Sequence, residues 1–189
     1  MPVLHLVVGP NGAGKSSYAR DVLCPATSLR FVNADDIASA RWPDAQAEHA
    51  YVAAKAAEEL RRELIASGAS FISETVFSHP GKIALVADAS ALGYLVHLHV
   101  ILVPVDLAVQ RVAERVRRGG HKVPEEKIRQ RHNRLWSHVA AALEIADVGE
   151  VLDNSCPRRP FRLCATYLHG APVGSPSWPT WVPAPLVVG

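Results

Sequence analysis

The sequence is poor in cysteine, aromatic residues and net charge, and it has no long apolar run. Three cysteines among 189 residues form no C-x-x-C pair, so we expect no disulfide framework and a reduced, cytoplasmic setting. The longest nearly uncharged apolar run, residues 95–105, is too short to span a bilayer. No basic segment followed by an apolar run opens the chain, so we expect neither a signal peptide nor a membrane partner.

The composition is that of a soluble globular protein, with 49% apolar and 20% charged residues, which excludes a disordered chain. A net charge of +2 is too small to indicate a nucleic-acid partner. Residues 111–134, however, hold seven arginines and two lysines against three acidic residues, which makes this segment locally basic. A basic segment on a mildly acidic body favours a local anionic ligand over a long polyanion.

Apolar runs typical of buried strands alternate with helical patterns. Strands are expected at 3–8, 30–32, 70–73, 94–103, 147–152 and 161–168, and helices after position 14, within 45–67, around 81–91, within 106–118 and from 124. This alternation predicts right-handed βαβ crossovers and an α/β fold of three layers, with a mostly parallel sheet flanked by helices. We expect the domain to cover residues 1–170.

The last segment, residues 171–189, differs in composition. It contains five of the 14 prolines and two of the four tryptophans, Trp178 and Trp181. Because proline at this density disfavours regular sheet or helix, we expect an extended, loosely ordered tail. The alternative is a segment that packs its tryptophans on the body or on a partner.

A glycine-rich motif, GPNGAGKS, lies between the first expected strand and helix and matches G-x-x-x-x-G-K-[ST]. In such a P-loop the backbone N–H groups and the helix N-terminus bind phosphate oxygens, and the alternative is a merely structural glycine turn. Lys15 would bridge the β- and γ-phosphates of ATP, and the Ser16 hydroxyl would bind Mg²⁺. The candidate nucleotide-binding residues are Gly9, Pro10, Asn11, Gly12, Ala13, Gly14, Lys15, Ser16 and Ser17.

Two features narrow the class of P-loop protein. The sequence has no L-S-G-G-Q signature, which transporter ATPases need, and no N-K-x-D motif, which GTPases use to read the base. The short chain, the basic segment and an acidic turn after the second strand instead fit a small phosphotransferase of the P-loop kinase type.

Acidic side chains follow the second and third expected strands. Asp35 and Asp36 come after the second strand, and Glu74 and Thr75 end the third. Ligands of an open parallel sheet lie at the carboxyl ends of its strands, so these residues are expected near the P-loop. Asp35 is our candidate to accept a hydroxyl proton, and Glu74 would place substrate or metal-bound water. The alternatives are a helix cap at an aspartate before Ile37 and a capping or solvated role for Glu74.

The basic segment offers candidates to stabilise a transferring phosphate. Arg118 precedes Gly119 and Gly120, a glycine hinge suited to a lid at about 118–123, and Arg131 borders an apolar helix stripe where an anionic partner is needed. That partner is either an internal carboxylate or the phosphate. Arg111 and Arg115 lie opposite the valine stripe of their helix, where a solvated face is expected.

Two histidines alternate along the fourth expected strand. His97 and His99 share one face of it. Without a third ligand in view, such a pair packs in a core more often than it binds a metal ion. We therefore expect a packing role for both.

Four motifs in order resemble those of the zeta-toxin family of P-loop kinases, over about residues 3–143. They are GPNGAGKS, FVNADDIA, SFISETVFS and RVAERVRRGGHKVPEEKIRQR. The resemblance implies ATP-dependent phosphorylation, which in the best-known members modifies a hydroxyl of UDP-N-acetylglucosamine, with an antitoxin protein as candidate partner. The catalytic aspartate of the family corresponds to Asp35, its P-loop lysine to Lys15, and its γ-phosphate arginines to Arg118 and Arg131.

Together the motifs predict a kinase that uses ATP and Mg²⁺ and transfers the γ-phosphate to a small-molecule hydroxyl. Asp36, Glu74 and Thr75 would contact the acceptor. One alternative is a nucleotide-switched ATPase or ATP-binding module without an acceptor. The other is a nucleic-acid 5′-hydroxyl kinase, which ranks third because the basic segment is short and few aromatic residues accompany it.

Overall fold

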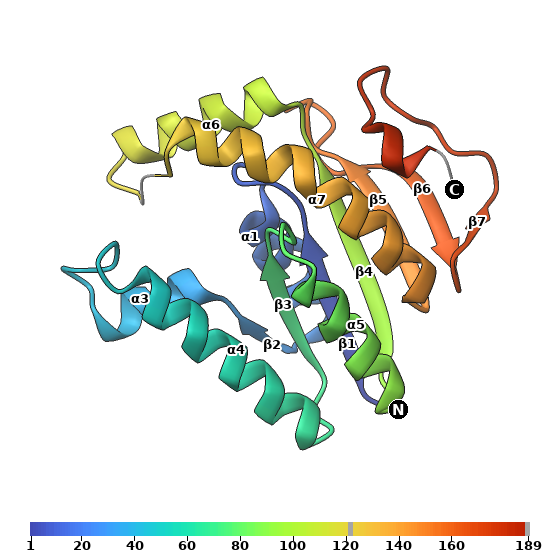
Figure 1. Ribbon diagram of the computed structural model, residues 1–189, viewed down its shortest axis with the longest axis horizontal. Coiled ribbons are helices and arrows are strands. Elements are labelled where there is room, and N and C mark those ends of the chain that lie inside the picture. The colour runs from blue at the N-terminus through green and yellow to red at the C-terminus, as the bar shows by residue number, and fades with distance from the viewer. Residues whose placement is uncertain (121–122, 188–189) are drawn as a thin grey trace.

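The computed structural model describes residues 1–120 and 123–187, and its centre is a seven-stranded sheet (Figure 1). The strand order is β2-β3-β1-β4-β5-β6-β7. The strands are β1 (Val3–Val8), β2 (Arg30–Val32), β3 (Phe71–Thr75), β4 (Leu95–Leu102), β5 (Val148–Asp153), β6 (Arg162–Leu168) and β7 (Ala171–Val173).

The first five strands are parallel, and β6 and β7 add an antiparallel edge. β1 lies between β3 and β4 and is the middle of the parallel part. Its nearly continuous apolar run suits a strand that is covered on both faces. The predicted α/β fold with a mostly parallel sheet is therefore confirmed.

Helices lie on both faces of the sheet. They are α1 (Lys15–Tyr18), which continues through the π-helical η1 (Ala19–Leu23) into α2 (Cys24–Thr27), then α3 (Ala34–Arg41), α4 (Ala50–Ala66), α5 (Gly81–Ala91), α6 (Val105–Arg117), α7 (Glu125–Ile145) and the 3₁₀ turn η2 (Ala184–Leu186). No helix within the described ranges is long and apolar enough to cross a membrane.

Each face of the sheet has its own apolar core, because side chains alternate along a strand. Leu4, Leu6 and Val8 of β1 pack with α4, α5 and α7, which lie in front of the sheet in Figure 1. Val7 of β1 and Ile101 of β4 pack on the opposite face with α6 and the α1–α2 segment. We call these the front face and the back face.

The C-terminal segment packs on the domain. Residues 171–173 pair with β6 as strand β7, so the expectation that proline would keep this segment out of the sheet is wrong there. An edge strand tolerates Pro172 because one side of it has no ladder to complete. Trp178 and Trp181 pack against the front core, and Leu186 is buried in it. The second of the two sequence-based alternatives, tryptophans packed on the body, is therefore the observed one.

The start of α3 also differs from expectation. The helix begins at Ala34, not near Ile37, and its N-cap is Asn33, whose Oδ1 accepts the N–H of Asp35 at 2.6 Å. Asparagine is among the best N-cap residues, so the aspartates are not needed for that role. Both aspartates instead lie in the first turn, where the helix dipole favours negative charge.

Candidate active site

The P-loop occupies the turn between β1 and α1, at the carboxyl end of the central strand. Gly12 and Gly14 have φ of +76° and +91°, values that residues with a Cβ rarely adopt. A Cβ on Gly12 would lie 2.6 Å from the carbonyl oxygen of Ala108, and one on Gly14 would lie 2.6 Å from Nδ2 of Asn154. These glycines therefore allow the loop to turn sharply and to pack closely against Ala108 and Asn154.

Lys15 begins α1 and folds back over the loop. Its Nζ donates a hydrogen bond to the carbonyl oxygen of Pro10 at 3.0 Å. The pKa of Lys15 is lowered, mainly because burial penalises the charged form. Glu74 and Asp35 act in the opposite direction, because their negative charges lie close enough to favour the ammonium. The lysine is thus held among carboxylates beside the phosphate-binding loop.

Ser16, Glu74 and Asn33 form a hydrogen-bonded group beside the loop. The Ser16 hydroxyl lies 3.0 and 2.9 Å from the two carboxylate oxygens of Glu74, which is the penultimate residue of strand β3. Nδ2 of Asn33 donates to Oε1 of Glu74 at 2.9 Å. Burial raises the pKa of Glu74, while the charge of Lys15 and the hydrogen bond from Ser16 oppose that shift. Glu74 is therefore a partly desolvated acid held in place by two donors.

Sequence reasoning missed Asn33. This buried side chain caps α3 and donates to Glu74, so it joins the two acidic segments predicted to lie near the loop. The position of Asn33 in the sequence could have indicated the capping role, because an asparagine that directly follows a strand and precedes a helix is a strong N-cap candidate.

A cleft of about 1050 Å³ opens over the P-loop. It is lined by residues from the loop, from the acidic turns and from α4, α6 and α7, among them Lys15, Ser16, Asn33, Asp35, Glu74, Thr75, Arg115 and Arg131. The structure thus brings Asp35, Glu74 and Thr75 close to the P-loop residues Lys15 and Ser16, as expected for the carboxyl ends of parallel strands. Arg131 reaches the same cleft from helix α7.

Two predicted site residues point elsewhere. Asp36 forms an exposed ion pair with Arg20. Arg118 pairs with Glu114 at 2.5 Å, and 77% of its side chain is exposed. Neither side chain lines the cleft. The proposed lid at 118–123 includes residues 121–122, which lie outside the described residues.

Two arginines that were expected on a solvated helix face lie at the P-loop or its cleft. Arg115 lines the cleft, and its charge is one of those that lower the pKa of Lys15. Arg111 is half-buried and donates to the carbonyl oxygens of Asn154 at 2.9 Å and Gly12 at 3.5 Å, so a solvated role is wrong for it. Helix periodicity predicts that both arginines lie opposite the valine stripe, but it does not show that the P-loop and its cleft are on that side.

Several solved structures are similar in fold. The AvrRxo1-ORF1:AvrRxo1-ORF2 complex with sulphate ions matches at 16% identity and a TM-score of 0.72, over 92% of this chain and 60% of that chain. The same complex with ATP gives 17% identity and a TM-score of 0.65 over the same shares. This chain therefore spans about 60% of the length of that neighbour.

Two further neighbours extend the comparison. The PezAT chromosomal toxin-antitoxin system of Streptococcus pneumoniae matches at 15% identity and a TM-score of 0.57, over 81% of this chain and 68% of that chain. Shikimate kinase from Acinetobacter baumannii matches at 20% identity and a TM-score of 0.51, over 77% and 81%. At such identities the likeness shows the fold alone, which is an α/β P-loop fold.

Sequence comparison gives the family. Among curated proteins, no relative matches this chain. The AAA domain family AAA_33, in contrast, matches residues 4–136, a range that contains the P-loop, both acidic turns and the arginines of α6 and α7. Because that range is more than half of the chain, the protein belongs to the AAA domain family AAA_33.

Proposed function

We propose that the protein is a cytoplasmic, ATP-dependent kinase that transfers the γ-phosphate to a hydroxyl of a small molecule. The observation that carries the proposal is the meeting of Lys15, Asp35 and Glu74 in one cleft beside the P-loop. The charges of both carboxylates act on the Lys15 ammonium, so all three lie within electrostatic reach of one another. A phosphate donor site and an acceptor-activating carboxylate are the two parts that such a reaction needs.

The loop residues 9–17 would bind the nucleotide. Their backbone N–H groups and the N-terminus of α1 favour phosphate oxygens, and Lys15 would move from the Pro10 carbonyl to the β- and γ-phosphates. The Ser16 hydroxyl and the Glu74 carboxylate are hard oxygen donors within 3.0 Å of each other, which fits Mg²⁺. Ser16 would bind the ion directly and Glu74 would hold it through water; bound there, Mg²⁺ neutralises charge on the transferring phosphate.

Asp35 would serve as the general base. It lies in the first turn of α3 and lines the cleft, where an acceptor hydroxyl that faces the γ-phosphate would give up its proton to the carboxylate. Arg115 and Arg131 line the same cleft from α6 and α7 and would stabilise the charge that develops on the phosphate. In this proposal Arg115 would have the role that was expected of Arg118, because it lines the cleft.

The acceptor is proposed from resemblance. The likeness of the four motifs to zeta toxins favours a nucleotide sugar, and the fold likeness to the PezAT toxin-antitoxin system supports an antitoxin protein as partner. The shikimate complex of shikimate kinase shows that a protein of this fold binds a small hydroxyl compound. A nucleotide sugar and other small hydroxyl compounds are therefore the first acceptors to test.

The test is acceptor-dependent ADP release over a panel of hydroxyl compounds, nucleotide sugars included, with Mg²⁺ present. We expect Lys15→Ala to weaken ATP binding, whereas Asp35→Asn should bind ATP as the wild type does and lose transfer by about 100-fold or more. Asp36→Asn, next to it but paired with Arg20, is the matched control and should keep its activity. ADP release that no acceptor changes would favour the ATPase alternative, and wild-type transfer in Asp35→Asn would remove Asp35 from the mechanism.

A further inference from the structure

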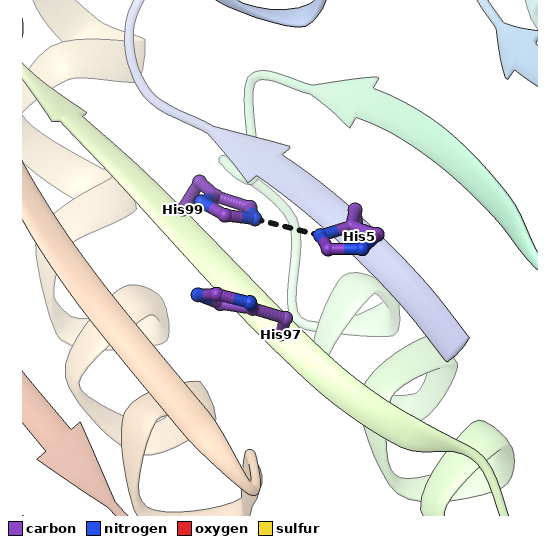
Figure 2. Close-up of side chains that lie close together, drawn as sticks. All are labelled: His5, His97 and His99. Atoms are coloured by element: carbon purple, nitrogen blue, oxygen red, sulfur yellow. Dashed lines mark hydrogen bonds between the residues drawn. The ribbon is translucent and has the colours of Figure 1, made fainter. Parts of the chain in front are cut away.

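Three histidines gather on the back face of the sheet, away from the P-loop cleft. His5 comes from β1, and His97 and His99 come from the neighbouring strand β4 (Figure 2). The parallel register places His5 opposite His97 and Val7 opposite His99. Because side chains alternate along a strand, all three share the face that carries Val7 and Ile101 nearer the carboxyl ends. Three imidazoles thus lie together in the middle of a sheet face whose carboxyl-terminal part is apolar.

The three rings present nitrogen atoms to one another. Nδ1 of His5 lies 3.0 Å from Nε2 of His99, as the dashed line in Figure 2 shows. One nitrogen from each of the three rings lies within 4.8 Å of the other two. We propose that His5, His97 and His99 form a binding site for one divalent transition-metal ion, with Zn²⁺ as the favoured occupant, separate from the Mg²⁺ of the kinase reaction.

The spacing suits zinc. Zn²⁺ binds imidazole nitrogen at about 2.0–2.1 Å in a tetrahedral arrangement, which sets neighbouring ligand nitrogens roughly 3.3 Å apart. The nitrogens of His5 and His99 are already close to that separation. Their hydrogen bond uses one proton between two nitrogens. A metal ion would take the place of that proton, which would move to the second nitrogen of the donor ring. The third nitrogen lies within 4.8 Å of the other two, so a shift of at most about 1.5 Å would bring it to the same distance.

A second layer of groups supports the three rings. Oε2 of Glu150 on β5 lies 3.2 Å from Nε2 of His97 and 3.3 Å from Nδ1 of His99. The Tyr18 hydroxyl lies 3.2 Å from the same Nδ1 of His99. Histidine ligands of a metal ion commonly donate their second N–H to a carboxylate, which fixes the ring and makes the ligating nitrogen more basic. Glu150 is placed to do this for two of the three histidines at once.

The protonation state of the rings also suits a metal ion. Burial, with the charges of His99 and His97, lowers the pKa of His5 to about 4, and burial lowers that of His99 as well. Both imidazoles are therefore neutral at pH 7, the form whose lone pair binds metal. The side chain of His97 is 20% exposed, so the cluster lies at the edge of the buried region. Burial thus keeps these imidazoles neutral, which is the form that binds a metal ion.

The experiment is titration of untagged protein with Zn²⁺ alone, without nucleotide, followed by calorimetry. We expect one ion per chain, with the affinity lowered by more than about 100-fold in His5→Gln and in His97→Gln, and by about 10- to 100-fold in Glu150→Gln. His5 and His97 are partly exposed, so both variants are expected to fold, which circular dichroism checks. In the wild type, Zn²⁺ should also raise the melting temperature, because the ion binds the folded chain.

Two controls make the result decisive. His169→Asn removes an exposed histidine outside the cluster and suits the left-handed backbone there, and Cys156→Ser removes an exposed thiol; both should bind Zn²⁺ as the wild type does. Absence of Zn²⁺ binding by the folded wild type would overturn the proposal. So would binding that is unchanged in both His5→Gln and His97→Gln, or binding that is lost in either control.

Discussion

The hydroxyl of Ser16 and the carboxylate of Glu74 meet at 2.9 and 3.0 Å, although 58 residues separate them in the sequence. The parallel pairing of β1 and β3 causes this contact, because it sets Val8 beside Thr75 and so brings the end of β3 to the P-loop. The proposed magnesium site therefore depends on the register of two strands as much as on the loop motif.

Glu74→Gln tests that site. The amide keeps the shape of the side chain and removes the charge beside Ser16 and Lys15, so Mg²⁺ should bind more weakly. We expect the Mg²⁺ concentration for half-maximal phosphate transfer to rise about 10-fold or more. A magnesium titration of the transfer rate measures this. Glu63→Gln, an exposed acid on α4, is the control, and an unchanged Mg²⁺ requirement in Glu74→Gln would contradict the assignment.

Arg115 and Arg118 provide a matched pair on α6 and its C-cap. Arg115 lines the cleft, whereas Arg118 is paired with Glu114 at the surface. We expect Arg115→Ala to lower the transfer rate by about 100-fold or more, since the loss of a cation at the transferring phosphate removes transition-state stabilisation. Arg118→Ala should stay within a few-fold of the wild type. Kinetics of both variants with saturating ATP would show it, and the reverse order would restore Arg118 to the site.

The parts of the site that the sequence predicted are those set by local chemistry. The P-loop motif and the strand-end positions of Asp35 and Glu74 follow from residue type and from the rule that parallel sheets bind ligands at their carboxyl ends. Asn33 was overlooked because two aspartates beside it have almost the same capping preference. Arg115 and Arg118 lie on one helix turn, and periodicity does not say which of them reaches a cleft formed by other segments.

The histidine cluster and the C-terminal segment needed the three-dimensional fold. His97 and His99 were visible as an alternating pair, but His5 joins them only through the pairing of β1 with β4. The proline content of the last residues predicts that regular helix or sheet is unfavourable there. It does not show how much apolar surface of the domain these residues can cover. Leu186 is 3% exposed because it packs into the front core, which includes residues of α7.

Leu186 and its neighbour Val187 test whether the C-terminal segment stabilises the domain. Leu186 is buried in the front core, whereas Val187 is 48% exposed. We expect Leu186→Ala to lower the free energy of unfolding by about 2–4 kcal/mol, because it leaves a cavity in the core. Val187→Ala should change it by less than about 0.5 kcal/mol. Urea denaturation of the two variants gives both values, and equal small effects would mean that the segment adds no stability.

The histidine cluster makes stability depend on pH. The pKa of His5 is lowered from 6.5 to about 4 by burial and by the neighbouring His97 and His99. Between these two values the unfolded chain binds a proton that the folded chain does not, so the free energy of unfolding falls as the pH is lowered from 6.5 towards 4. Allowing for the partial exposure of His5, we expect about 1–2 kcal/mol to be lost between pH 7 and pH 5.

The pH window identifies the group. Glu150 also has a lowered pKa, because His97 and His99 favour its charged form, but it acts only below its ordinary value of 4.5. The loss between pH 7 and pH 5 therefore belongs to imidazoles. His99 in the cluster and His132 outside it, both with a pKa that burial lowers, contribute in the same window. Urea denaturation at several pH values, with a chelator to remove metal ions, should give a shallower slope for His5→Gln than for the wild type. Identical slopes would show that His5 titrates alike in the folded and unfolded chains.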